Sequence, residues 1–145
     1  MFIALPTEKI KLGMDEENET LQEGAKVDDG LVAKEKSHII LMDLIPALAR
    51  GDIFGVGRVI WKMQTLGSKA TEIAVHGKNI LPAMKHLFER VEGVAATGMS
   101  SIGPAVVIVT KQSKGFIEQE LKCFDMKLSY STRVDNQGHS VHKLP

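Results

Sequence analysis

The chain has 145 residues, of which 43% are hydrophobic and 25% are charged, and its 18 basic side chains balance its 18 acidic ones. This composition is typical of one globular domain with a buried core, and it argues against disorder and against a nucleic-acid partner, which would favour a basic excess. No apolar run reaches the roughly 18 residues of a membrane span, and the N-terminal residues lack signal-peptide features, so we expect a cytoplasmic protein without membrane contact.

The first predicted element is a strand over residues 2–5, which ends at Pro6. Because the strand begins almost at the first residue, we expect either a cut or the boundary of a missing preceding domain there. Residues 8–36 are polar and rich in turn residues, and they predict a connecting segment with one short helical turn. The acidic run at 15–19 lacks the alternating spacing of a calcium loop, so a solvated surface is favoured over a metal site.

Three helices are predicted next from the spacing of apolar residues. The first begins at an N-cap serine and covers residues 37–50. It should kink or start anew at Pro46, because a proline removes one helical hydrogen bond. Asp52 caps the second helix, over 53–66, and the third covers 79–92.

Several single residues within and after these helices are candidates for a functional role. Trp61 and Gln64 could face a ligand cleft, but partly buried packing is favoured. His76 and His86 have no Cys or His partner at metal-ligand spacing, which predicts surface positions. The single cysteine, Cys123, cannot form an internal disulfide, and its position in an amphipathic pattern predicts a small buried residue.

The last third of the chain predicts strands over 94–97 and 105–110, a helix over 113–124 and a strand over 128–134, followed by a frayed tail at 139–145. The order strand, helices, strand, strand, helix, strand is that of a split β-α-β motif. We therefore predict an α+β, ferredoxin-like sandwich. It has a four-stranded antiparallel sheet, helices on one face and extra helices in the first crossover.

The loop between the two middle strands is the best candidate for chemistry. The chain contains no Ser/His/Asp arrangement, paired-Cys zinc pattern, Walker-type loop or dinucleotide glycine fingerprint. In this loop, Gly98, Ser100, Ser101 and Gly103 could offer backbone amides and two hydroxyls to an anionic group such as a phosphate. A plain hairpin connection is the alternative, and the residues alone leave both open.

The loop Thr97-Gly98-Met99-Ser100-Ser101-Ile102-Gly103-Pro104 resembles the third motif of the GHMP kinase superfamily, which includes galactokinase, homoserine kinase and mevalonate kinase. Its Gly-x-Ser-Ser-x-Gly-Pro form is most similar to the branch of β-ribofuranosylaminobenzene 5'-phosphate synthase and related predicted archaeal sugar kinases. Three further segments fit that branch: residues 2–6 followed by Glu16-Glu17, residues 44–52 with Gln64 and Gly67 beyond, and residues 133–138.

The resemblance implies that residues 1–138 are the C-terminal domain of a two-domain protein. In the superfamily this loop lies beside the glycine-rich phosphate loop of the N-terminal domain, which implies a substrate- or phosphate-binding role here for Gly98, Met99, Ser100, Ser101 and Gly103. The synthase branch joins 4-hydroxybenzoate to phosphoribosyl pyrophosphate with loss of carbon dioxide and pyrophosphate, an early step of methanopterin synthesis in archaea. Other members transfer the γ-phosphoryl group of ATP. The full-length family therefore implies Mg²⁺ with ATP or phosphoribosyl pyrophosphate.

One departure from the family concerns mechanism. The second superfamily motif, Pro-x-x-x-Gly-Leu-Gly-Ser-Ser, which cradles the nucleotide phosphates, has no counterpart in the 145 residues, and neither has the general base of the N-terminal domain. The catalytic residues are therefore unknown. We expect this chain to bind no cofactor alone, and to turn over neither ATP nor phosphoribosyl pyrophosphate.

The alternative is a free-standing ferredoxin-like module that binds a small ligand or regulates a partner, because one fold hosts many functions. A neighbouring reading frame encoding the phosphate-loop domain would favour the transferase interpretation. If a domain is missing, the face bearing Met99 and the edge of the first strand should expose an apolar patch. We therefore expect a homo-oligomer.

Overall fold

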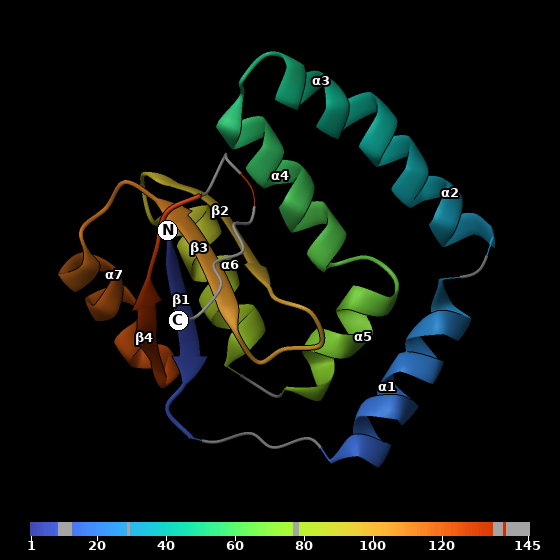
Figure 1. The fold of residues 1–145 in the computed structure, drawn as a ribbon, viewed down its shortest axis with the longest axis horizontal. Coiled ribbons are helices and arrows are strands. Elements are labelled where there is room, and N and C mark those ends of the chain that lie inside the picture. The colour runs from blue at the N-terminus through green and yellow to red at the C-terminus, as the bar shows by residue number, and fades with distance from the viewer. Residues whose placement is uncertain (9–12, 29, 77–78, 135–137, 139–145) are drawn as a thin grey trace, which may run out of the picture.

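The computed structural model describes residues 1–8, 13–28, 30–76, 79–134 and 138 (Figure 1). The elements in chain order are β1 (Phe2–Pro6), α1 (Met14–Val27), α2 (Gly30–Ile39), η1 (Ile40–Leu44), α3 (Ile45–Ala49), α4 (Ile53–Gln64), α5 (Ser68–Val75), α6 (Ile80–Arg90), β2 (Val94–Met99), β3 (Val106–Thr110), α7 (Lys114–Leu121), η2 (Lys122–Phe124) and β4 (Met126–Ser131). Of these, η1 is a π-helix of five residues and η2 is a 3₁₀-helix.

The four strands of the described residues form one antiparallel sheet in the order β2-β3-β1-β4. Central β1 pairs with both neighbours, so that Ile3 lies opposite Val107 on β3 and opposite Tyr130 on β4. The helices α1–α6 connect β1 to β2, and α7 connects β3 to β4. This is the split β-α-β order, so the predicted α+β, ferredoxin-like class is confirmed, including the extra helices in the first crossover.

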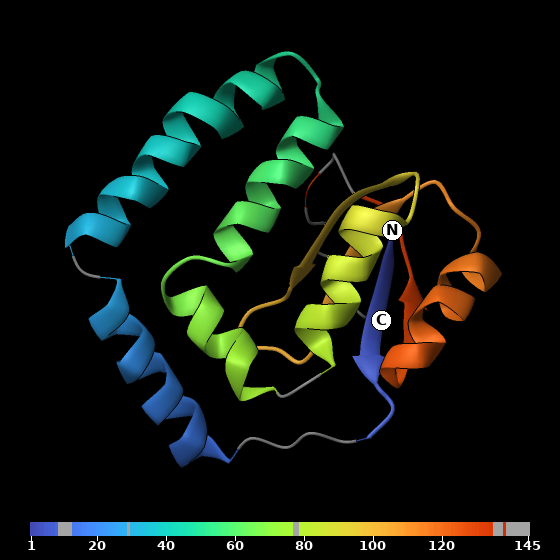
Figure 2. The same cartoon turned by 180° about the vertical axis from the view of Figure 1, so that it is seen from behind.

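Helices α6 and α7 cover one face of the sheet, as the rear view shows (Figure 2). Their apolar side chains meet those of the strands in a core in which each large side chain contributes about 1.5–3 kcal/mol by leaving water. The fully buried members include Ile80, Met84 and Leu87 on α6, Ile117 and Leu121 on α7, and Val106 and Ile108 on β3.

Two helices, α1 and α2, occupy the region predicted to be a connecting segment, and that prediction was wrong. The first turn of α1 carries three acidic side chains, which suit the positive end of a helix dipole. Glu16 accepts a hydrogen bond from the Gly13 amide at 3.0 Å. Helix α1 packs on α5, where a Cβ added to Gly24 would lie 2.9 Å from the Ser68 Cβ. A helix that buries so little apolar surface leaves a weak hydrophobic pattern in its sequence.

The helix predicted to start at Ser37 begins earlier, because Ser37 lies within α2 and donates its hydroxyl hydrogen bond to the Ala33 carbonyl at 2.8 Å. The expected break at Pro46 takes the form of the π-helical turn η1, closed by a bond from the Ile45 amide to the Ile40 carbonyl. Pro46 has no amide hydrogen to donate, and its ring would clash with the preceding turn of an α-helix. The wider π-helical turn accommodates the missing hydrogen bond and the ring.

Helix α4 runs along the outer edge of β2. As predicted, Asp52 caps it, accepting from the Gly55 amide at 2.8 Å. At the crossing, a Cβ on Gly57 would lie 1.7 Å from the Ala95 carbonyl oxygen, so only glycine allows this approach. The helix thereby covers the edge of the sheet that would otherwise be open to pairing.

Two smaller expectations need correction. Met99 is buried, at 4% exposure, and β1 is a central strand, so neither forms the exposed patch expected from the sequence. Cys123 is exposed, because Leu121 takes the inward position at the end of α7.

The tail at 139–145 and residues 135–137 of the family segment lie outside the described residues. Within the described residues, no helix combines the length and apolar character needed to cross a membrane.

Candidate functional site

The predicted loop closes the hairpin between β2 and β3, next to α5 (Figure 1). Its backbone is bonded across the turn: the Ser100 amide donates to the Ala105 carbonyl at 2.8 Å, and the Gly103 amide donates to the Ser100 carbonyl at 2.9 Å. Ser100 and Ser101 are exposed. The loop therefore presents two serine side chains at the surface, while the amides of Ser100 and Gly103 serve the turn itself.

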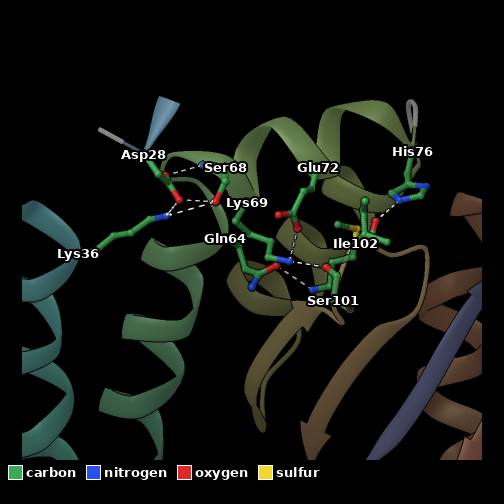
Figure 3. Close-up of polar contacts among 10 residues, drawn as sticks. Asp28, Lys36, Gln64, Ser68, Lys69, Glu72, His76, Ser101 and Ile102 are labelled. Atoms are coloured by element: carbon green, nitrogen blue, oxygen red, sulfur yellow. Dashed lines mark hydrogen bonds and ion pairs between the residues drawn. The ribbon is translucent and has the colours of Figure 1, made fainter. Parts of the chain in front are cut away.

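Gly98 and Met99, also predicted to bind ligand, belong to the end of β2 and connect the loop to α4. The Met99 amide donates to Gln64 Oε1 at 2.8 Å, and the Gln64 side chain lies over Gly98, where a Cβ would be 3.1 Å from Gln64 Nε2 (Figure 3). Gln64 is itself buried. The packing role expected for Gln64 is confirmed, because its side-chain amide fixes the strand end from which the loop departs, and the same side chain also lines the hollow between α4, β2 and β3.

Gly103 and His76 meet on the other side of the loop. Gly103 has a φ of +98°, and a Cβ there would lie 2.5 Å from His76 Nε2 and 2.6 Å from the Met99 sulfur, so no other residue fits. His76 is only 4% exposed, and its Nε2 contacts the Ile102 carbonyl oxygen. The predicted surface position of His76 is therefore wrong, because the loop, which is distant in sequence, covers the ring.

His86, the other histidine predicted at the surface, is half-buried on α6. Its Nε2 lies 2.6 Å from Glu120 Oε2 on α7. This pair joins the two helices that cover the sheet and lies outside the loop region.

A polar face of α5 contacts the loop. Lys69 donates to the Ser101 carbonyl oxygen and pairs with Glu72, its Nζ 2.5 Å from Glu72 Oε2 (Figure 3). Lys69, Glu72 and His76 are spaced i, i+3 and i+7, which places them on one side of a helix. This spacing is the signal that could have identified them, but helix α5 itself was not predicted.

The N-terminus of α5 is held by Asp28, at the end of α1. Asp28 accepts from the Ser68 amide at 2.8 Å, from the Ser68 hydroxyl at 2.6 Å and from Lys36 Nζ at 2.6 Å (Figure 3). Burial alone would raise the pKa of Asp28, but the hydrogen bonds from Lys36 and Ser68 outweigh it and lower that pKa to about 2. Gly67, with a φ of +61°, leaves room for the carboxylate, since a Cβ would lie 2.0 Å from Asp28 Oδ1.

Two hollows of the described surface lie against α4. A mostly apolar cavity of about 200 Å³ borders Gly98, between α4 and the strands β2 and β3. A more polar cleft of about 240 Å³ lies away from the loop, between α3 and α4. In that cleft Lys62 Nζ lies 3.0 Å from Asp43 Oδ2, so its charge is already paired. Among the described residues, no group of three or more His, Cys, Asp or Glu side chains lies close enough together to hold a metal ion.

Sequence comparisons identify relatives of the chain, although no protein-family model matches it. The β-ribofuranosylphenol 5'-phosphate synthase of Archaeoglobus fulgidus is 32% identical over 101 residues, which are 70% of this chain and 30% of that protein. Synthases of the same name from Methanothermobacter thermautotrophicus and Methanocaldococcus jannaschii are 37% identical over 79 residues and 28% identical over 108 residues. These matches cover 54% and 72% of this chain, and 23% and 31% of the two synthases.

The chain thus spans less than a third of the length of the curated relatives it matches. The similarity covers more than half of this chain in each case, and all three relatives carry one name. The resemblance stated from the loop motif is therefore confirmed, and the chain is a relative of the archaeal β-ribofuranosylphenol 5'-phosphate synthases of the GHMP superfamily.

Proposed function

We propose that this chain forms the substrate-side part of a transferase of the β-ribofuranosylphenol 5'-phosphate synthase type. The observation that carries the proposal is the 32% identity to the Archaeoglobus fulgidus synthase over 70% of the chain. The reaction implied by this resemblance joins 4-hydroxybenzoate to the ribose carbon of phosphoribosyl pyrophosphate, and carbon dioxide and pyrophosphate leave. Each phosphate group of that substrate is an anion that needs hydrogen-bond donors.

In this proposal the 97–104 loop contacts a phosphate group of the substrate. Ser100 and Ser101 are exposed, so their hydroxyls are free to turn toward an anion. Gly98, Met99 and Gly103 contribute indirectly, because their contacts with Gln64 and His76 set the shape of the turn. No residue of this chain is assigned to the bond-making step.

An exchange of segments between proteins tests the proposal. The matching segment of the Archaeoglobus fulgidus synthase would be replaced by this chain, and release of carbon dioxide from carboxyl-labelled 4-hydroxybenzoate would be measured with phosphoribosyl pyrophosphate. We expect the chimera to be active and the isolated chain to be inactive. In the chimera, the double change Ser100→Ala, Ser101→Ala should lower kcat/KM by roughly 100-fold, because two hydrogen bonds to a charged group are lost.

The matched control is Ser131→Ala at the exposed end of β4, which should leave the rate unchanged. Thermal unfolding of the double variant should change little, since exposed hydroxyls contribute less than about 0.5 kcal/mol to folding. A folded but inactive chimera would favour the free-standing binding module instead. Equal losses of stability and activity would identify the loop as a structural turn.

A further inference from the structure

Two consecutive carbonyls of the loop, those of Ser101 and Ile102, point at helix α5 (Figure 3). Lys69 donates to the first, and His76 Nε2 contacts the second. A carbonyl oxygen only accepts, so His76 holds its proton on Nε2. The other ring nitrogen, Nδ1, is buried and has no partner among the described residues. The His76 ring therefore contacts the loop through Nε2.

The geometry of the peptide group fixes the consequence for the amides. In a planar trans peptide the N–H and C=O point in opposite directions, and the peptide between Ser101 and Ile102 is trans. Since its carbonyl points at α5, the Ile102 N–H points away from α5. The Gly103 amide, in the next peptide, is already bonded to the Ser100 carbonyl. No backbone carbonyl of the described residues accepts from the Ile102 amide.

The backbone at Ser101 supports the same arrangement. Its φ of +48° lies in the left-handed region, which a residue with a side chain keeps only where its surroundings require it. Together with the bond from the Gly103 amide to the Ser100 carbonyl, this backbone angle fixes the orientation of the peptide between Ser101 and Ile102 at the centre of the turn. Lys69 itself is neutralised by Glu72, so it acts on the loop through the Ser101 carbonyl rather than as a free cation.

We infer that the Ile102 amide is an anion-binding donor of this loop, and that Lys69 and His76 are positioning residues that aim it by holding two carbonyls inward. The ligand class is a phosphoryl or pyrophosphoryl group, bound by the Ile102 N–H together with the hydroxyls of Ser100 and Ser101. The inference rests on the proposed function for the identity of the anion. The orientation of the amide follows from the contacts alone.

Nuclear magnetic resonance of the ¹⁵N-labelled 145-residue chain tests the inference, with inorganic pyrophosphate as the probe at constant ionic strength. We expect a saturable change whose largest amide shift is at Ile102. Lys69→Met and His76→Phe should each weaken binding about tenfold, because each frees one carbonyl to turn outward. His76→Gln keeps a side-chain donor at the position of Nε2 and should restore most of the affinity. Lys114→Met, on α7, removes the same charge away from the loop and is the matched control.

Each outcome decides the inference. It is overturned if pyrophosphate causes no saturable shift at Ile102, or if Lys69→Met binds as tightly as the parent. It is also overturned if Lys114→Met weakens binding as much as Lys69→Met. If His76→Phe fails to fold, Lys69→Met and His76→Gln carry the test. If the chimera is inactive but pyrophosphate binds at Ile102, the proposed function is refuted and this inference stands. If the chimera is active but pyrophosphate does not bind at Ile102, this inference is refuted and the proposed function stands.

Discussion

Replacing Asp28 by asparagine should destabilise the protein and remove part of its sensitivity to acid. The carboxylate of Asp28 accepts three hydrogen bonds, two from Ser68 and one from Lys36. Although burial raises the pKa of Asp28, these bonds lower it from the usual 3.8 to about 2. At 1.36 kcal/mol per pKa unit, the ionised form stabilises the folded state by about 2 kcal/mol.

The sign of the pH dependence follows from that lowered pKa. Because the folded-state pKa lies below the unfolded one, this stability is fully present above pH 3.8 and is lost as the pH falls toward 2. Urea unfolding followed by circular dichroism between pH 7 and pH 2 measures it. The parent should be about 2 kcal/mol more stable than Asp28→Asn at pH 7, and this difference should shrink below pH 4.

The control for this measurement is Asp43→Asn. Asp43 pairs with Lys62 at 3.0 Å, but both side chains are largely exposed, so the change should cost less than about 1 kcal/mol. A difference between the parent and Asp28→Asn that stays constant from pH 7 to pH 2 would show that the carboxylate charge is not what holds the N-terminus of α5. An effect of Asp43→Asn as large as that of Asp28→Asn would show that the loss is a general charge effect.

Two further predictions concern the loop and self-association. Gly103→Ala should lower stability by about 2–4 kcal/mol in thermal unfolding, because it combines a left-handed φ with a clash against His76, whereas Gly30→Ala, in open space, should not. A result equal to that of Gly30→Ala would refute the close packing of the loop. The expected homo-oligomer should show in sedimentation at high concentration, and Leu41→Lys with Ile45→Lys should make it monomeric, since these side chains are 61% and 51% exposed. A parent that remains monomeric would refute it.

The hydrophobic part of the fold could be predicted from the sequence, because its pattern is local. Helix α6 shows apolar residues such as Met84 and Leu87 at helical spacing, and β3 is a short run of β-branched residues between turns. The strand order follows from the sequence of elements once these are placed. The polar helices were missed for the opposite reason. Helix α1 ends in a contact between Asp28 and Ser68, 40 residues apart, which no local pattern reveals.

The candidate site was found in part. The family motif located the loop, since glycine and serine at fixed spacing are visible in the sequence. The sequence did not show that the Met99 amide is occupied by Gln64, or that Lys69 and His76 hold the carbonyls of the loop, because these contacts join residues 26 to 35 positions apart. Ile102 carries no such signal in the sequence, because its side chain is apolar and only its backbone amide is of interest.

The crossover helices α1, α2 and α5 link the fold to the candidate site. A helix as short as the eight residues of α5 is not stable alone in water, so its position depends on what holds its ends. Asp28 holds the first turn, and His76, just after the last turn, is held under the loop by the Ile102 carbonyl. The polar segments α1 and α2, which add little to the core, thus fix the helix whose lysine and histidine set the direction of the loop carbonyls. We therefore expect changes in this crossover to affect anion binding at the loop more than their small apolar burial would suggest.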